Sequence, residues 1–481
     1  MRQGRPERTG GRGASHDPRG WSHRRWHRGV TTNGADLLEL ALARVLAEGA
    51  ASADAVLVES DVLEARVRGR EIDFVKQARE QTLGIRSFVE GSKGLRCAIT
   101  SSSDLRAETV ARIAEECVAL ARAIAPDPVA GLPEDGFARE IPDLSLFAPG
   151  EHPFSVDDRI QSARQAEAAA RAADVRVTNS EGSQVGSDYS RIVYATSSGF
   201  VGEYRTASHS LFSEPIVSQN GDMQRDYWLT VGRSLSSLED PAQVGRRAAE
   251  RALRRLGARR IPTCEVPVIF DPLTAPSLLG HLVQCVNGYA VYRGASFLAG
   301  RLDEAIASEQ VTVIDDGRLP GGLGSKPFDA EGQPTRRNVV IERGRLASYL
   351  LDSYSARKLE LKTTGNAGRS VASAPRAMPT NLWLEPGSLS LEDIIGGTPR
   401  GLLVTELIGM GFNPVTGDYS QGAVGFWIEA GEIVHPVHEV TIAGHLGDML
   451  SSIDAIGNDL LWLGRVAAPS LRVARMTVAG D

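Results

Sequence analysis

The sequence predicts an α+β protein in which two N-terminal units of helices and strands precede a large Gly-rich antiparallel β domain with few helices. Amphipathic helical patterns and alternating strand patterns succeed one another twice before residue 260. From residue 261 the chain changes to short apolar runs separated by glycines. A length of 481 residues, with 42% hydrophobic and 23% charged residues, is typical of a folded protein of two or three domains.

The first α+β unit is expected over residues 33–128. Thr32 or Asn33 can cap a helix whose apolar residues fall on one stripe. This stripe comprises Leu37, Leu38, Ala41, Val45 and Leu46. Strand-like alternation and a hairpin follow, and Ser103 or Asp104 is expected to start a second helix.

A linker rich in Pro, Gly and Asp, residues 129–154, separates the first unit from a middle α+β unit at 155–260. A capping pattern at Ser155 predicts the start of its first helix. Strand-like runs come next, and Asp240 before Pro241 predicts the start of another helix. The middle unit therefore repeats the order of helix, strands and helix.

The C-terminal part, residues 261–481, is predicted to be the β-rich domain. The run CEVPVIFDP has the pattern of a buried strand, and Thr274 to Asn287 has the strongest helical pattern that follows. Many short β runs separated by glycine turns come next. The run HLGDMLSSIDAIGND predicts a last helix over residues 445–459.

Residues 1–32 differ from the rest and predict a disordered basic extension. They hold eight arginines against Glu7 and Asp17, with no hydrophobic period that could form a core. Because the whole chain has a net charge of −7, the remainder is more acidic still. An acidic body argues against binding of nucleic acid, which requires a basic face to neutralise phosphates.

Two further features favour a cytoplasmic protein that does not span a membrane. No run reaches the ~18 apolar residues of a membrane helix, and the N-terminal segment lacks the apolar stretch of a secretory signal. The cysteines are scattered without a CxxC motif, which is typical of a reducing compartment. They are Cys97, Cys117, Cys264 and Cys285.

His281 and Cys285 are the first candidate metal ligands, because positions i and i+4 share one face of a helix. A zinc site needs a third ligand, and a hydrolytic site usually has a carboxylate base nearby. The predicted helix contains neither Asp nor Glu. We therefore expect both residues to pack in a core or interface, and the metal-site alternative stays open.

The second candidate group comprises His435, His438 and His445. His435 and His438 lie in a strand-like run, where positions i and i+3 point to opposite faces of a sheet. They cannot easily bind one ion, and His445 could only approach from the following turn. The prediction is a β surface with imidazoles and no metal, although an unorthodox site remains the alternative.

The run LPGGLGSKPFDAEGQP resembles a phosphate-binding loop only superficially. Lys326 follows Ser325 and precedes Pro327, so neither the GK[ST] order nor a helix N-terminus is present. A G-x-S-x-G nucleophile motif is also missing from the sequence. The loop is expected to be a β connection or to shape a channel, and the sequence displays no catalytic constellation.

Three runs together resemble a known family. They are GHLVQCVNGYAVYRGASFLAGRL, DDGRLPGGLGSKPFDAEGQPTRR with the later TGNA, and NPVTGDYSQGAVGFWIEAGEIVHPVHEVTIAG. These runs are similar to the TldD/PmbA family, and in particular to its PmbA (TldE) branch. The resemblance extends over residues 35–465 and is densest between Leu279 and Asn458.

This resemblance implies a division of labour between two subunits. TldD-type subunits are zinc metallopeptidase chains with an HExxxH helix and a later cysteine ligand. PmbA/TldE-type subunits share the fold, lack the ligands and pair with TldD in a heterodimer. The pair degrades unfolded or short peptides and removes leader peptides from modified peptide antibiotics.

Aligned on Arg293 and Gly294, the positions of HExxxH are degenerate in this chain. Leu279 and Gln284 stand where the metal-binding histidines would be, and Gly280 replaces the catalytic Glu. His281 is out of register, and the run NPVTGDYSQG lacks the later cysteine. The resemblance thus implies a catalytically silent subunit with no metal of its own, and zinc is expected in a TldD-type partner.

Such a subunit is expected to complete the chamber around the partner's zinc and to hold an extended peptide, for example by strand addition. The candidate chamber residues are Tyr289, Tyr292, Arg293, Gly321, Gly322 and Lys326. Two rival functions remain: a peptidase active in its own right through an unorthodox metal site, and a regulatory protein-binding module.

Overall fold

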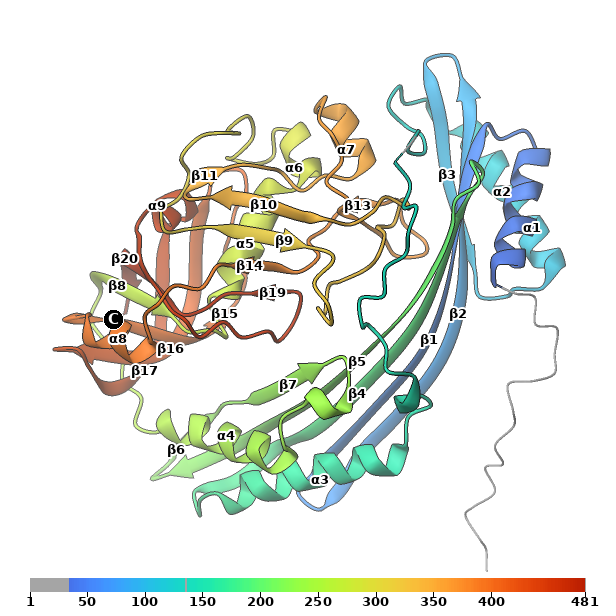
Figure 1. Cartoon of the computed structure of the whole chain (residues 1–481). Coiled ribbons are helices and arrows are strands. Elements are labelled where there is room, and N and C mark those ends of the chain that lie inside the picture. Colours follow the sequence, from blue (N-terminus) through green and yellow to red (C-terminus); the bar gives the residue numbers. More distant parts are fainter. Residues whose placement is uncertain (1–33, 135, 481) are drawn as a thin grey trace, which may run out of the picture.

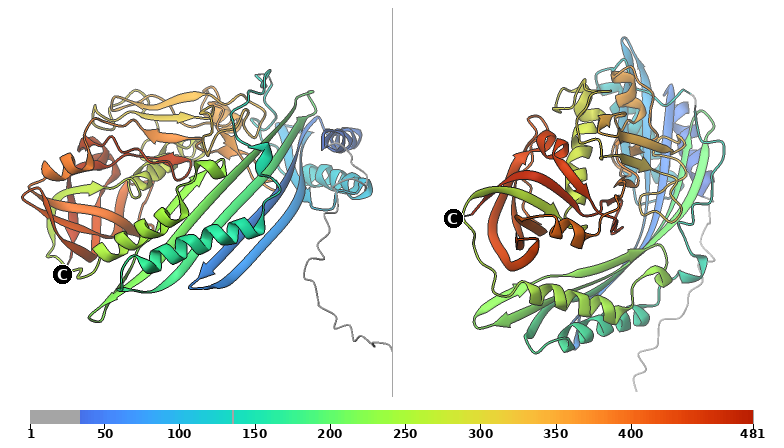
Figure 2. Two further views of the ribbon diagram at one scale, coloured as in Figure 1. Left: turned by 60° about the horizontal axis from the view of Figure 1, so that its bottom comes forward. Right: turned by 60° about the vertical axis from the view of Figure 1, so that its left-hand side comes forward.

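A computed structural model describes residues 34–134 and 136–480 of the chain. One long, curved β-sheet holds the C-terminal domain on its concave face, and four helices lie on the opposite face (Figures 1 and 2). This arrangement confirms the predicted α+β class. The expected basic extension at residues 1–32, with the caps Thr32 and Asn33, lies outside the described residues.

The seven-stranded sheet combines strands from both N-terminal units. Its order is β3-β2-β1-β4-β5-β6, with β7 also paired to β5, and all its pairs are antiparallel. The central pair β1–β4 joins residues 33–128 to residues 155–260 in one sheet. The strands are β1 (Ser52–Arg68), β2 (Glu71–Gly91), β3 (Gly94–Ser102), β4 (Val177–Thr196), β5 (Val201–Gln219), β6 (Asp222–Arg225) and β7 (Trp228–Gly232).

Alternation along β1 explains why the sheet is covered on both faces. Ala55, Leu57 and Ala65 are buried in the cores formed with the helices. Val56 and Val58 point the other way and pack in a cluster with residues of the C-terminal domain. The period of two therefore assigns odd positions to the helices and even positions to the C-terminal domain.

Two helix pairs cover the outer face of the sheet. The helices are α1 (Gly34–Ala47), α2 (Ala107–Ala123), α3 (Val156–Ala172) and α4 (Pro241–Arg254). As predicted, Ser155 caps α3 and Asp240 caps α4, since their side chains accept backbone N–H groups at the third following residue. The second helix is present as predicted, but its expected start at Ser103 or Asp104 is wrong, because Asp104 instead binds Arg106 and Thr109 and the helix starts at Ala107.

The predicted apolar stripe of α1 is correct except at its end. Four of its five members are buried, whereas Leu46 is 40% exposed. Leu42 is buried in its place. One residue corresponds to ~100° around a helix, so the position after Val45 turns toward solvent.

The C-terminal domain contains a six-stranded sheet in the order β17-β16-β15-β8-β20-β18. An additional β17–β20 pairing joins the two sides, and such closure leaves few free strand edges. Most pairs are antiparallel as predicted, but β15 and β8 pair in parallel. The strands are β8 (Cys264–Phe270), β15 (Arg400–Ile408), β16 (Asp418–Glu429), β17 (Glu432–His445), β18 (Ile453–Ile456) and β20 (Leu471–Ala479).

A second sheet of the C-terminal domain has the order β11-β10-β9-β14-β19, and a small β12–β13 pair lies beside it. The helix α5 (Pro276–Val286) contributes Leu278, Leu279 and Leu282 to the large core shared with both C-terminal sheets. The remaining strands are β9 (Val313–Asp316), β10 (Arg337–Glu342), β11 (Arg345–Leu346), β12 (Ala367–Gly368), β13 (Arg376–Ala377), β14 (Leu382–Leu384) and β19 (Val466–Ala467). The short helices are α6 (Gly288–Tyr292), α7 (Ser353–Lys358), α8 (Leu391–Gly396) and α9 (Leu446–Ser451).

The last predicted helix is correct only in its first half. α9 ends at Ser451, and the following residues form strand β18, which pairs with β20. Ile453, Ala455 and Ile456 are all buried by this pairing, so the sheet overrides the helical pattern. Among the described residues, no helix combines the length and apolar character that crossing a bilayer requires.

Candidate functional site

Helix α5 places the three degenerate motif positions in different surroundings. Leu279 is 2% exposed and belongs to the C-terminal core, whereas Gln284 is exposed on the other side of the helix. A side chain added at Gly280 would meet no atom within 4 Å. Neither Leu279 nor Gly280 offers a ligand atom, so these positions do not fit a zinc ion.

His281 and Cys285 share a buried face of α5, as predicted. The His281 ring packs against the rings of Phe412 and Tyr419, with centroids 4.6 and 5.6 Å away. Burial lowers the pKa of His281, and burial raises the pKa of the Cys285 thiol to about 12. Cys285 would have to bind a metal as a thiolate, and this apolar environment disfavours the thiolate.

The three histidines of the second candidate group are held apart in β17. His445 bonds Thr416 O through Nε2 and accepts the Gly447 N–H through Nδ1, so both ring nitrogens are engaged. His435 contacts the Pro436 carbonyl through Nδ1. Within residues 34–134 and 136–480, no three His, Cys, Asp or Glu side chains converge in a way that could hold a metal ion.

The candidate chamber residues fall into two separate groups. Tyr289, Tyr292 and Arg293 cluster on α6, where Arg293 Nη1 donates to the Tyr289 hydroxyl at 2.9 Å. Tyr292 packs against Tyr354 of α7. Gly321, Gly322 and Lys326 belong to the glycine-rich loop after β9, at the contact with the large sheet. Their role in binding substrate remains a prediction.

A cavity of about 620 Å³ lies between the concave face of the large sheet and the C-terminal domain. Val58, Ile192 and Tyr204 form part of its sheet wall. Lys326, Arg369 and Met378 line it from the C-terminal domain. Its volume falls within the range of ~300–1,000 Å³ that is usual for ligand pockets.

The loop at Lys326 is fixed to the sheet by an aromatic cluster. Phe328 is 2% exposed, and its ring lies 5.4 Å from that of Phe200 and 5.2 Å from that of Tyr204. A Cβ at Gly202 of β5 would lie only 2.7 Å from the Phe328 ring. Glycine at this position therefore permits the close approach of the loop to the strand.

Arg233 holds the other end of the same loop. It follows β7, and its Nη2 donates to the carbonyls of Gly322 and Leu323 at 2.8 Å each. Its Nη1 donates to Ala207 O at 2.9 Å and to the Thr206 hydroxyl. Burial lowers the pKa of this guanidinium to about 10.

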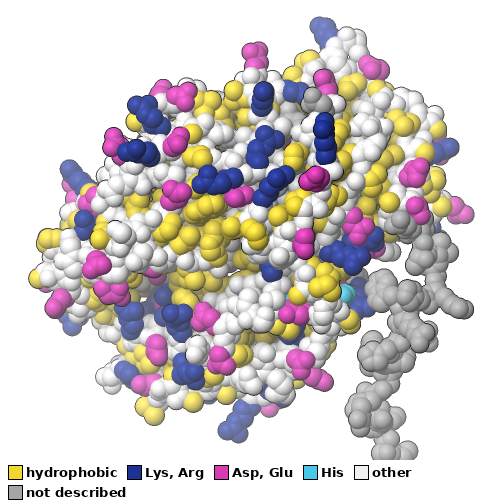
Figure 3. All heavy atoms as spheres, viewed as in Figure 1, with side chains coloured by type: hydrophobic (Ala, Val, Ile, Leu, Met, Phe, Trp, Pro, Cys, Tyr) yellow, Lys and Arg dark blue, Asp and Glu magenta, His cyan; other side chains and the backbone are white. Residues whose placement is uncertain are grey.

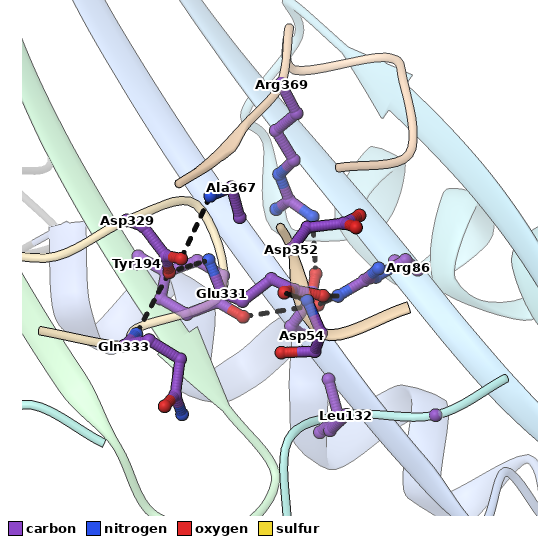
Figure 4. A network of polar contacts seen from close by, with 12 residues as sticks. Asp54, Arg86, Leu132, Tyr194, Asp329, Glu331, Gln333, Asp352, Ala367 and Arg369 are labelled. Carbon is purple, nitrogen blue, oxygen red and sulfur yellow. Dashed lines mark hydrogen bonds and ion pairs between the residues drawn. The ribbon is translucent and has the colours of Figure 1, made fainter. Parts of the chain in front are cut away.

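A buried ionic network beside the cavity joins the sheet to the C-terminal domain (Figure 4). Asp54 of β1 forms ion pairs with Arg86 of β2 and, at 2.8 Å, with Arg369 of the loop after β12. Burial alone would raise the pKa of Asp54, but Arg369 and Arg86 together lower it. Arg86 also lies 4.0 Å from Glu331, whose pKa is raised to about 7 by burial.

Comparison with known proteins supports the architecture and the assignment of the family. Family models described as PmbA/TldA metallopeptidase domain 1, central domain and C-terminal domain match residues 53–121, 150–256 and 263–480. Metalloprotease PmbA of Escherichia coli O157:H7 is 41% identical over 413 residues, which cover 85% of this chain and 88% of that protein. The chain belongs to the PmbA/TldD metallopeptidase family.

Other members of the PmbA/TldD family are also similar over almost the whole chain. The Metalloprotease PmbA homolog of Haemophilus influenzae is 34% identical, over 90% of this chain and 93% of that protein. The crystal structure of TldE from Thermococcus kodakarensis is 25% identical and superposes with a TM-score of 0.83, over 92% of this chain and 100% of that chain. The expected membership of the PmbA/TldE type is therefore confirmed.

Sequence reasoning missed most of the residues that surround the cavity of this family member. Lys326 was a candidate because of its glycine-rich loop, but Arg233 and Asp54 carry no local motif. Asp54 and Arg369 are 315 residues apart, and only the folded chain brings them together. The available signal was the run DAVLVES, in which Asp54 directly precedes four apolar residues of a strand.

Proposed function

We propose that this chain is the catalytically silent PmbA/TldE-type subunit of a heterodimeric zinc metallopeptidase. A TldD-type partner supplies the zinc and the HExxxH motif, and this chain helps to hold an extended, unfolded or short peptide. The observation that carries the proposal is the state of α5, where Leu279 faces the core and Gly280 has no side chain. Neither residue can bind zinc or act as a base.

The proposal places the pair in the cytoplasm, where it degrades peptides or removes a leader peptide from a modified peptide product. All four cysteines are free, which supports a reducing compartment. On the face in Figure 3, Lys and Arg side chains alternate with Asp and Glu over the described residues, without one extended basic area. This mixture supports a peptide or protein partner rather than nucleic acid.

Coexpression with a TldD-type chain tests the proposal. We expect the two chains to copurify, and the pair to cleave an unfolded peptide with zinc bound to the partner. Replacing the Glu of the partner's HExxxH motif by Gln should abolish cleavage, because that residue is the general base. The matched change Gln284→Ala in this chain should leave cleavage unchanged, since Gln284 is exposed on α5.

Two results would contradict the proposal. Cleavage by this chain alone, lost on Cys285→Ser, would support a peptidase active in its own right. Failure of the chains to associate, with a partner that is equally active alone, would favour a separate protein-binding role. Size-exclusion chromatography with light scattering distinguishes association from its absence.

A further inference from the structure

The cavity between the large sheet and the C-terminal domain is lined by two partly buried cations, Arg233 and Lys326, that form no ion pair with a described carboxylate. Arg233 donates to two pairs of neutral oxygen acceptors, and it forms an ion pair with no carboxylate of the described residues. Its Nε is buried without a hydrogen-bond partner in the same part of the chain. Burying an unpaired cation is costly, so such a group is usually kept for a ligand.

Lys326, in the loop whose carbonyls Arg233 binds, shows the same feature. Its Nζ donates to the Ala367 carbonyl at 2.6 Å and forms no ion pair with a described carboxylate. Burial lowers the pKa of this ammonium group. An ammonium group carries three N–H donors, so two of them remain available to a ligand.

Two more arginines add to the positive charge around the cavity. Arg369 is 5% exposed and pairs with Asp54, but its Nε has no partner among the described residues. Arg465 also lines the cavity and forms no described ion pair. The opposing charges are Asp188, which is half-buried, and Asp329, and Asp315 also lies near enough to Lys326 to interact with it.

The acidic residues of the cavity are less able to neutralise these cations than their number suggests. Asp329 already accepts three backbone N–H groups, from Glu331, Gln333 and Ala367. Burial raises the pKa of Asp188, and burial also raises the pKa of Asp329. The cavity therefore retains an excess of cationic hydrogen-bond donors.

We propose that this cavity binds a carboxylate group of a peptide at Lys326, close to the charge of Arg233, while an adjacent apolar side chain packs on the sheet wall. The carboxylate is the chemistry that an ammonium donor recognises. Val58, Ile192 and Phe328 supply the apolar surface next to them. This inference rests on the proposed function, in which the chain holds a peptide, and it adds the chemical group that is recognised.

Two sources of the carboxylate are possible in a peptide: the C-terminus and an acidic side chain. Three fluorescein-labelled peptides of otherwise identical sequence distinguish them. The first ends in Leu with a free carboxylate, the second ends in Leu amide, and the third ends in Glu amide. Fluorescence anisotropy with the full chain measures the affinity of each peptide.

We expect the free acid to bind at least about tenfold more tightly than the Leu amide, because it gains charge-assisted hydrogen bonds. Lys326→Met should remove this preference, since methionine keeps a similar shape without the charge. The matched control Lys362→Met, at an exposed position, should retain the preference. If the Glu amide binds like the free acid, the cavity accepts a side-chain carboxylate; if it binds like the Leu amide, the cavity selects the C-terminus.

Equal binding of acid and amide by the wild-type chain, or no binding of either, would overturn the inference. A preference that survives in a correctly folded Lys326→Met variant would also overturn the assignment to this cavity, with folding checked by circular dichroism. The outcome is separable from the proposed function. Loss of carboxylate preference with intact pairing refutes only the cavity, whereas intact preference without pairing refutes only the heterodimer.

Discussion

Asp54 and Asp315 are both completely buried carboxyl groups near the contact between the large sheet and the C-terminal domain, yet their environments differ. Asp54 has two guanidinium partners, Arg86 and Arg369, and its pKa is lowered. Asp315 of β9 forms no ion pair among the described residues; it receives hydrogen bonds from Asn366 and Thr380, and Lys326 is a more distant cation. Burial raises the pKa of Asp315 to about 6 despite these bonds.

The difference shows that burial by itself does not determine whether a carboxyl group is charged. Opposite charges offset the loss of hydration at Asp54, whereas amide and hydroxyl dipoles offset only part of it at Asp315. The Asp54 network therefore fastens two parts of the molecule as an ion cluster. Lys326 on the cavity wall, in contrast, forms no direct ion pair with a described carboxylate and interacts with Asp329 and Asp315 only at longer range.

The largest effect on stability is expected from Asp54→Ala, which disrupts the ion cluster of Asp54, Arg86 and Arg369. This change leaves Arg86 and Arg369 buried without their shared carboxylate, so the free energy of unfolding should fall by about 3–5 kcal/mol. Urea denaturation measures the change. The control Asp73→Asn removes an exposed ion pair with Arg66, at 3.7 Å, and should cost less than about 1 kcal/mol. Equal effects of the two variants would contradict the comparison.

A smaller effect is expected from Asp315, which should make the free energy of unfolding depend on pH. Because the folded-state pKa of Asp315, about 6, exceeds its ordinary value of 3.8, its stabilising contribution is complete below the unfolded pKa and is lost as pH rises through about 6. The free energy of unfolding of the wild type should thus fall by about 2 kcal/mol relative to Asp315→Asn between pH 3.8 and pH 6.5. Parallel pH profiles of the two proteins would show that Asp315 titrates normally.

The smallest effect is expected for Lys326→Met in the absence of ligand. The substitution relieves the burial of a cation but leaves the Ala367 carbonyl without its donor, and these contributions oppose each other. The free energy of unfolding at pH 7 should change by less than about 1 kcal/mol. A loss of more than about 3 kcal/mol would make Lys326 a structural residue, like those of the Asp54 network.

Local sequence patterns predicted those parts of the architecture that depend on residues close together in the chain. The caps Ser155 and Asp240 and the α+β class follow from spacing within a few residues. The prediction failed where long-range pairing decides the structure. At residues 453–456 the helical pattern of HLGDMLSSIDAIGND is overridden by pairing with β20.

The cavity illustrates the same limit for functional residues. The glycine-rich loop attracted attention to Lys326, and the structure places it on the cavity wall. Arg233 follows a short strand without a motif, and its partners Gly322 and Leu323 lie about ninety residues further along the chain. Such a site depends on the docking of two domains, and no window of neighbouring residues contains it.

The central claim, that this chain carries no catalytic metal, is tested most directly by zinc binding. Titration of the purified full-length chain with zinc against a chromophoric chelator measures the number of tight sites. The account predicts no stoichiometric site, because Leu279 and Gly280 offer no ligand and the Cys285 thiol remains protonated. One tightly bound zinc per chain, lost on His281→Ala or Cys285→Ser, would contradict it.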